Sequence, residues 1–178
     1  MKILFLDFDG VLNTGKYSRQ LHREKRPGWD DFGELFDPDA VANLKLIIDT
    51  VPDVKLVVES SWKASGMNYL AGMWAVRDLP GKLFGITPDL PHEDLLQLNL
   101  ADPDFMVRVE GHCKGNEILA WMKSHADEEC RFVIIDDCSG FTGELKEHLV
   151  LVDPYEGLTQ EDTMKAIMLL CQKDYKKE

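Results

Sequence analysis

The sequence predicts an α/β fold, a three-layer Rossmann-like parallel sheet of about five strands with helices on both faces. Short apolar runs alternate along the chain with segments whose apolar residues recur at helical spacing. The strand-like runs lack polar alternation, which is typical of parallel strands buried on both faces. With 178 residues, 44% hydrophobic and 29% charged, the chain can bury a core of its own. We therefore expect one domain over residues 1–178.

The first predicted strand, residues 3–6, leads directly into Asp7, Asp9 and Gly10. Two acids spaced i, i+2 would point to opposite faces of a regular strand. Gly10 allows the chain to turn at once, so both acids can converge on one ligand. The carboxyl ends of strands are where open α/β sheets bind their ligands. Taken alone, Asp-Phe-Asp-Gly is also compatible with an ordinary turn.

Residues 14–37 separate this strand from the next helix and exceed the usual connection of about 2 to 6 residues. We interpret them as a small cap insertion. Its basic and aromatic side chains are Lys16, Arg19, Arg23, Lys25 and Arg26, with Tyr17, His22 and Trp29 among them. Such a lid would attract an anionic substrate, although a solvated charge run is an equally ordinary interpretation.

The middle of the chain predicts two helices and two strands. Asp37 and Pro38 form an N-cap and a first-turn proline, and Ser65 is a second expected N-cap. Strands are expected over residues 55–58 and 82–86. The apolar faces expected for the two helices are Val41, Leu44, Ile47 and Ile48, and Met67, Leu70, Ala71 and Trp74.

The second half begins with a long stretch, residues 87–113, that we expect to wrap the sheet edge or flank the site. Within it, residues 105–109 suggest an extra edge strand. The remaining expected elements are a helix from Lys114, strands over residues 131–135 and 148–152, and a final helix that begins with a capping box at residues 159–162. Their expected inward residues are Ile118, Leu119, Met122 and Ala126, and then Met164, Ile167, Met168 and Cys171.

Other chemistry-bearing residues also follow predicted strands or begin a helix. Ser60 and Ser61 offer hydroxyls to an oxyanion, and Lys114 would aim a positive charge inward. Asp136 and Asp137 add two carboxylates at the same sheet edge. Clustered oxygen ligands suit Mg²⁺ better than Zn²⁺. Each residue alone could be a turn, cap or surface residue, so the combination carries the functional hypothesis.

This combination resembles the haloacid dehalogenase-like (HAD) superfamily. Its phosphatases carry DxDG after the first strand, Ser or Thr after the second, Lys before the fourth and an acidic pair after it. The matching residues are Asp7, Asp9, Gly10, Ser60, Lys114, Asp136 and Asp137.

A closer resemblance is to the HAD domain of Swiss Army Knife RNA repair proteins. That group has a Ser-Ser-Trp-Arg-like motif, a Gly-x-Glu-Ile helix start and a late Gly-Leu-Thr. Here they stand as Ser60-Ser61-Trp62-Lys63, Gly115-Asn116-Glu117-Ile118 and Gly157-Leu158-Thr159. The chain departs from the pattern at Lys63, where arginine is expected, and at Glu59, where a neutral residue is expected.

The resemblance implies a Mg²⁺-dependent phosphohydrolase acting on a phosphate monoester. Asp7 would attack phosphorus to form an aspartyl-phosphate, and Asp9 would protonate the leaving oxygen and then activate water. Ser60, or Ser61 in its place, would hold the phosphoryl group together with Lys114.

The remaining implied contacts concern the substrate and the metal. Gly10, Ser61 and Lys63 are the expected further substrate contacts. The expected metal ligands are Asp7, the backbone carbonyl of Asp9, and Asp136 or Asp137. We favour Asp137 as the direct ligand and Asp136 as the nearer neighbour of Lys114, with the reverse order left open.

Other functions stay open at this stage. A phosphomutase uses the same acid pair, whereas a dehalogenase typically lacks an acid like Asp9. A non-catalytic phosphate- or Mg²⁺-binding module, or a phospho-acceptor resembling a response-regulator receiver, is the alternative from another class. In receivers, however, the phosphorylated aspartate follows the third strand, where this chain has Thr87-Pro88 and reaches an aspartate only at Asp89.

Charge and composition narrow the partners. The net charge of −12 argues against extended nucleic-acid binding, which needs basic surface. We expect a small phosphorylated substrate, and the basic insertion also makes a nucleotide or an RNA or DNA end a plausible substrate.

No apolar run approaches the roughly 20 residues of a membrane span. The four cysteines lack CxxC spacing and are interpreted as reduced thiols of a cytoplasmic protein.

Overall fold

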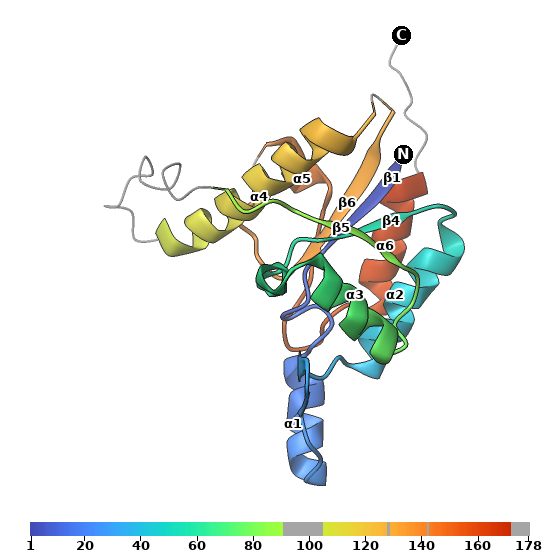
Figure 1. The fold of residues 1–178 in the computed structure, drawn as a ribbon, viewed down its shortest axis with the longest axis vertical. Helices are drawn as coiled ribbons and strands as arrows, with labels where there is room; N and C mark the ends of the chain where they lie inside the picture. The colour runs from blue at the N-terminus through green and yellow to red at the C-terminus, as the bar shows by residue number, and fades with distance from the viewer. Residues whose placement is uncertain (91–104, 128, 142, 172–178) are drawn as a thin grey trace.

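The computed structural model describes residues 1–90, 105–127, 129–141 and 143–171, and of residues 105–113 the backbone alone. Its centre is a five-stranded sheet with the order β5-β4-β1-β6-β7, in which all neighbouring strands are parallel (Figure 1). The strands are β1 (Lys2–Leu6), β4 (Lys55–Val58), β5 (Leu83–Ile86), β6 (Arg131–Asp136) and β7 (Leu149–Leu151). The predicted parallel α/β sheet is therefore confirmed.

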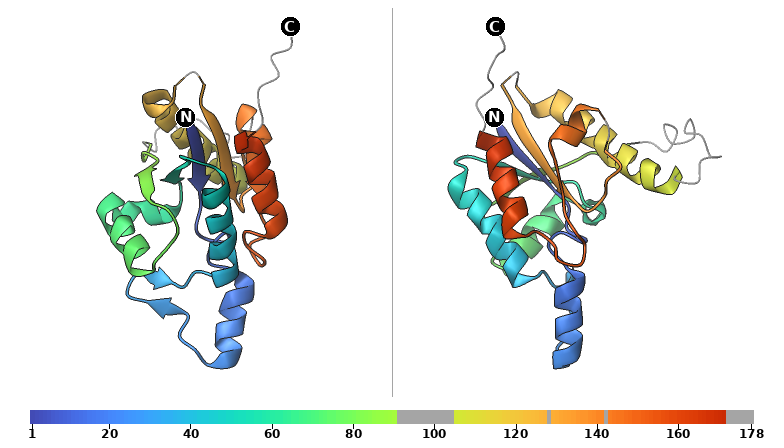
Figure 2. Two further views of the ribbon diagram at one scale, coloured as in Figure 1. Left: turned by 90° about the vertical axis from the view of Figure 1, so that its right-hand side faces the viewer. Right: turned by 180° about the vertical axis from the view of Figure 1, so that it is seen from behind.

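Helices cover both faces of this sheet (Figures 1 and 2). One face packs against α2 (Pro38–Thr50), α3 (Met67–Val76) and α6 (Gln160–Cys171), and the other against α4 (Phe105–His125) and α5 (Glu144–Glu147). Alternate residues of β1 divide between the two cores, with Leu4 and Leu6 on the first face and Ile3 and Phe5 on the second. This two-sided burial explains why β1 is apolar from Ile3 to Leu6.

The start of α2 follows its predicted capping, whereas the start of α3 does not. The Asp37 carboxylate accepts from the amide of Asp39, and Pro38 occupies the first turn. Ser65 is not the N-cap of α3, because a 3₁₀ helix, η1 (Ser61–Ser65), already includes it. Gly66, at φ 84°, begins α3 instead. A positive φ suits glycine, which lets the chain change direction between the two helices.

The expectation of an edge strand over residues 105–109 is wrong, because these residues form the first turns of α4. A run of five residues is too short to specify a strand, and extending an existing helix adds a hydrogen bond for each residue fixed. On this helix Leu119 is 51% exposed, and Trp121 faces the core in its place. What we expected of residues 91–104 lies outside the described part of the chain.

The buried face of α6 is also offset from the predicted one. Met164 and Met168 are more than half exposed, and Cys171 is exposed as well. The residues that α6 buries are Asp162, Thr163, Ala166 and Leu170. The predicted capping box is present, since Thr159 and Asp162 exchange hydrogen bonds between side chain and backbone amide. The Thr163 hydroxyl donates to the Asn43 carbonyl on α2 at 3.5 Å, so this side of α6 faces α2.

Residues 14–37 form α1 (Gly15–Glu24) and an antiparallel pair, β2 (Trp29–Asp30) and β3 (Gly33–Glu34). This insertion projects from the end of the molecule where β1 finishes (Figures 1 and 2). Its two ends are tied together, because the Thr14 hydroxyl donates to Asp37 at 2.8 Å. The Asp37 amide in turn donates to the Leu12 carbonyl at 2.7 Å. Because both ends are held, the insertion leaves and rejoins the fold at one place.

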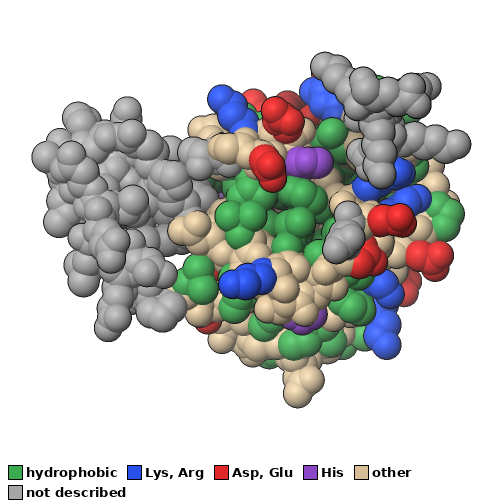
Figure 3. All heavy atoms as spheres, turned by 90° about the horizontal axis from the view of Figure 1, so that it is seen from above, with side chains coloured by type: hydrophobic (Ala, Val, Ile, Leu, Met, Phe, Trp, Pro, Cys, Tyr) green, Lys and Arg blue, Asp and Glu red, His purple; other side chains and the backbone are tan. Residues whose placement is uncertain are grey.

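The opposite end of the molecule has a mixed surface. Figure 3 looks onto that end and shows exposed hydrophobic side chains with acidic and basic ones around them. Among the described residues, no helix combines the length and apolarity that crossing a bilayer requires. Cys130 and Cys171 carry free thiols, in keeping with the prediction for them, and the side chain of Cys113 lies outside the described part.

Candidate active site

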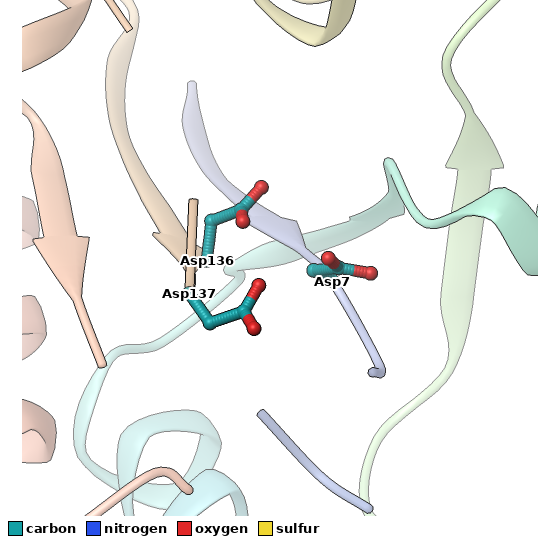
Figure 4. A group of neighbouring side chains, drawn as sticks. All are labelled: Asp7, Asp136 and Asp137. Atoms are coloured by element: carbon teal, nitrogen blue, oxygen red, sulfur yellow. The ribbon is translucent and has the colours of Figure 1, made fainter. Parts of the chain in front are cut away.

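Three carboxylates meet where β1 and β6 end (Figure 4). Asp7 follows β1 and Asp136 closes β6, and the two strands pair in parallel so that Leu6 lies beside Ile135. Ligand oxygens of Asp7, Asp136 and Asp137 lie within 4.8 Å of one another. Asp7 and Asp136 are almost wholly buried. The strand register therefore brings together acids that are far apart in the sequence, as the sequence predicted.

Lys114 reaches this cluster from α4. Its ammonium donates to Asp7 Oδ2 at 2.6 Å and to Asp136 Oδ2 at 2.8 Å. The structure thus confirms Asp136 as the acid of the late pair that contacts the lysine. Burial by itself would lower the pKa of Lys114, but the carboxylates around it raise that pKa above its usual value.

The cluster carries more negative than positive charge. Burial raises the pKa of Asp7, an effect that Lys114 opposes and Asp136 reinforces. Burial, with the charges of Asp136 and Asp7, raises the pKa of Asp137 to about 6. Three carboxylates beside one ammonium group leave an excess of negative charge on hard oxygen donors. This donor set fits Mg²⁺.

Asp9 lies in a different environment from Asp7. It is exposed, and it accepts hydrogen bonds from Asn13 Nδ2 at 2.7 Å and from Trp62 Nε1 at 3.0 and 3.2 Å. The Ser61 hydroxyl adds a longer contact of 3.4 Å. The sequence did not predict the roles of Asn13 and Trp62 as partners of Asp9, although Trp62 belongs to the motif that carried the closer family resemblance.

Gly10 makes the turn between the two acids and has φ 70°. An ideal Cβ at this position would overlap the Asp137 carboxylate and the side chain of Pro154. The glycine is therefore needed for the close approach of Asp137 as well as for the turn. Its amide already donates to the backbone and side-chain oxygens of Asn13.

Ser60 and Ser61 lie beside different acids of the site. Ser60 is fully buried, and its hydroxyl hydrogen-bonds Asp7, a contact that partly opposes the rise that burial causes in the pKa of that carboxyl. Ser61 is exposed and contacts Asp9. The one-residue ambiguity between them thus becomes a difference in position, with Ser60 on the side of Asp7.

The structure places Lys63 among different partners from those of the other predicted site residues. Its ammonium contacts Glu117 on α4 at 2.5 Å and Asp89 at 3.2 Å. It also donates to the Thr87 hydroxyl and to the Pro88 carbonyl, both at 3.2 Å. Lys63 therefore joins η1 to the end of β5 and to α4.

Glu59 is a buried acid that sequence reasoning did not assign to the site. It is 1% exposed, and neither of its carboxyl oxygens has a hydrogen-bond partner among the described residues. Burial raises its pKa well above the usual value, and the charge of Asp136 adds to the shift. This shift favours the protonated, neutral form of Glu59. The available signal was its position, directly after the apolar residues 56–58 of β4.

Comparison with known families gives one result. The family model described as the HAD domain in Swiss Army Knife RNA repair proteins matches residues 3–163. The matched region includes all of the residues described above for this site. No match was found among curated proteins or among solved structures.

Proposed function

The chain belongs to the family of HAD domains found in Swiss Army Knife RNA repair proteins, and from this premise we propose that it is a Mg²⁺-dependent phosphatase. The family suggests phosphatase-type hydrolysis in general. The observation that carries the specific proposal is the separation of two acids on one turn. Asp7 is buried against Lys114, whereas Asp9 is exposed and held by neutral donors. Two acids in such different surroundings suit two different chemical roles.

In the first step, a carboxylate oxygen of Asp7 attacks the phosphorus of a phosphate monoester. The new bond to Asp7 forms as the bond from phosphorus to the leaving oxygen breaks. Asp9, protonated before this step, gives its proton to that oxygen. The products are the free alcohol and an aspartyl-phosphate on Asp7.

In the second step, water attacks the phosphorus of the aspartyl-phosphate. Asp9, now ionised, takes a proton from the water as the bond between phosphorus and Asp7 breaks. Inorganic phosphate leaves, and both acids return to their initial states. The exposure of Asp9 supports this role, because it must meet both an alcohol and a water molecule.

The other site residues would offset the negative charge of the phosphate and of the carboxylates. Asp7, Asp136, Asp137 and the Asp9 carbonyl would hold Mg²⁺, which when bound supplies positive charge against the phosphate and the carboxylates. Ser60 and Lys114 would bind the phosphoryl oxygens. Without this compensation, a phosphate dianion would be strongly repelled by the acids.

The surroundings of the three further predicted substrate contacts, Gly10, Ser61 and Lys63, favour them to different degrees. Ser61 stays in the proposal because it is exposed beside Asp9. Gly10 contributes through its shape, since its amide is bonded to Asn13. We do not retain Lys63, because two carboxylates and two neutral oxygens already surround its ammonium.

A nucleic-acid end or a nucleotide is the proposed substrate. The family description names RNA repair, and the insertion carries exposed basic residues, among them Arg19 and Arg23 on α1. Trp29 on β2 is 68% exposed, and an exposed indole can stack on a base. A local basic insertion on an acidic protein suits a short end better than an extended strand.

The test is phosphate release, with and without Mg²⁺, from an aryl phosphate, sugar phosphates, nucleotides, and RNA and DNA oligonucleotides with a terminal phosphate. We expect Mg²⁺-dependent release that is fastest on the nucleotide or oligonucleotide substrates. Asp7→Asn should reduce it on the order of 10³-fold or more. Asp49→Asn, a change at an exposed aspartate, serves as the control.

Three results would contradict parts of the proposal. Activity confined to sugar phosphates would reject the nucleic-acid end. Movement of phosphate between positions of one sugar, without release, would indicate a phosphomutase. Binding of Mg²⁺ and phosphate without any turnover would indicate a non-catalytic module.

A further inference from the structure

The proposed proton donor has an unusual setting for an exposed acid. Asp9 lies on a turn with its side chain open to solvent, yet donors from Asn13, Ser61 and Trp62 surround its carboxylate. An exposed aspartate without such contacts exchanges among several rotamers. Proton transfer to a leaving group requires a defined position within hydrogen-bond reach. The donors around Asp9 therefore bear on catalysis.

Trp62 is the donor that contacts both oxygens of Asp9, at 3.0 and 3.2 Å. A bond to a single oxygen would leave the carboxyl group free to rotate about its last torsion. A shared N–H instead fixes both the direction and the plane of the group. The indole N–H is only a donor, so it cannot take the proton that Asp9 must deliver.

The indole itself is held on several sides. Phe8 meets its ring edge to face, with centroids 5.7 Å apart, and Phe36 lies at the same distance. The Arg77 guanidinium lies over the ring at 5.7 Å. Gly33 of β3 lies so close that an ideal Cβ there would be 3.0 Å from Trp62 Cη2. The N–H is therefore oriented before any substrate arrives.

From these contacts we propose that Trp62 is a positioning residue, whose indole N–H orients Asp9 for proton transfer to the leaving oxygen. The inference rests on the proposed function of Asp9. Oδ1 accepts the two shortest bonds, from Asn13 and Trp62, whereas Oδ2 has only longer contacts.

The experiment compares two substrates that differ in their need for an acid. Expulsion of an alkoxide from an alkyl phosphate requires protonation, whereas para-nitrophenolate leaves readily without it. The measured quantity is kcat/KM, which reports steps through departure of the leaving group and excludes later hydrolysis of the aspartyl-phosphate. Trp62→Phe keeps an aromatic ring and removes the N–H. We expect its kcat/KM to fall roughly 10-fold or more for the alkyl phosphate and less than about 2-fold for the aryl phosphate.

Trp74→Phe is the matched control. Trp74 stacks on the same Phe8, but its indole donates to the Pro80 carbonyl instead of Asp9. The control removes the same chemical group from the same aromatic cluster. It should therefore leave the ratio of the two kcat/KM values unchanged, whatever it does to stability.

Two further measurements separate positioning from packing. An isosteric benzothienyl analogue at position 62 lacks the N–H and keeps the indole shape, so it should reproduce the effect of Trp62→Phe. In an Asp9→Asn background, Trp62→Phe should cause no additional loss on the alkyl phosphate, because the residues act as one unit.

Equal losses on both substrates, or additive losses in the double variant, would overturn the positioning role while leaving the phosphatase intact. If the wild-type protein hydrolyses neither substrate and no oligonucleotide phosphate, the proposed function itself fails. The two failures are therefore distinguishable.

Discussion

Asp7 and Asp9 are two residues apart, and the surrounding structure gives them different properties. Asp7 is 3% exposed and contacts Lys114, so its charge is balanced inside the fold. Asp9 faces solvent and accepts bonds from neutral N–H groups. A fixed, desolvated carboxylate suits attack on phosphorus, whereas an exposed one suits proton exchange. The proposed division of roles thus rests on the difference in burial as well as on the motif.

Glu59 is a further acid buried next to the carboxylate cluster of Asp7, Asp136 and Asp137. The family resemblance predicts a neutral residue at this position, and burial raises the pKa of Glu59 well above its usual value, which favours the protonated form. We predict that Glu59 is protonated in the folded protein, so that the departure from the pattern is one of residue type rather than of charge.

Glu59→Gln tests this protonation state. Above about pH 4.5 the unfolded chain loses the Glu59 proton while the folded protein keeps it, so wild-type stability falls as pH rises toward the folded-state pKa. Glutamine lacks this proton. The variant should therefore gain stability relative to wild type by up to about 1.4 kcal/mol per pH unit over that range.

Urea unfolding in EDTA between about pH 5 and about pH 8 measures this difference, with the exposed Glu144→Gln as the control. If the difference in the free energy of unfolding between Glu59→Gln and wild type is independent of pH, Glu59 is ionised in the folded protein. The same holds if the variant loses stability relative to wild type as pH rises.

The convergence of Asp7, Ser60 and Asp136 could be predicted from the sequence because parallel strands end at one edge, whereas Lys114 reaches them from within α4. The partners of Asp9 and Lys63 could not be predicted. They depend on the direction that each side chain takes after the strand has ended, which is set by the 3₁₀ turn of η1. Sequence spacing carries no such information for irregular backbone.

At the scale of the elements, η1 connects the two halves of the site. Its backbone presents Ser61 and Trp62 to Asp9, while Lys63 reaches the other way to Glu117 on α4, the helix that carries Lys114. The pair thus fixes two elements that supply site residues. It also joins two of the motifs that carried the family resemblance.

Lys63→Met tests this connection. It leaves Glu117, which has 12% side-chain exposure, without its cationic partner. Breaking a buried pair from one side costs about 3 kcal/mol or more, so the free energy of unfolding should fall by that amount. Lys63→Arg keeps the charge and should stay close to wild type.

Denaturant titration of these variants beside Lys45→Met gives the comparison. Lys45 forms an exposed pair with Asp49, and removing such a pair costs less than about 1 kcal/mol. Equal losses for Lys63→Met and Lys45→Met would show that the buried pair contributes no special stability.

The strands were predictable as elements because each is a short apolar run between turns. The predictions failed where tertiary packing decides between similar local patterns. Residues 105–109 form a short apolar run but belong to α4, and α6 turns Thr163 rather than Met164 toward α2. Helix phase and short apolar runs are both weakly specified by local sequence.

For the molecule as a whole, the net charge of −12 contrasts with the basic residues of the insertion. The insertion projects from the end where β1 finishes, and the face opposite to it shows both signs of charge (Figures 1 and 3). Attraction of an anionic substrate would therefore be local to the insertion and its site. The sequence predicted the insertion by its length, while its α1 and hairpin structure became clear only in three dimensions.

We propose that Asp7 carries the phosphoryl group during turnover. An acid quench of the protein turning over para-nitrophenyl phosphate with Mg²⁺, followed by borohydride reduction and peptide mass spectrometry, detects this group. Because hydride reduces an acyl phosphate to the alcohol, we expect homoserine at position 7 in the wild-type protein and none in Asp7→Asn. Turnover with an unmodified Asp7, or reduction at a different residue, would contradict it.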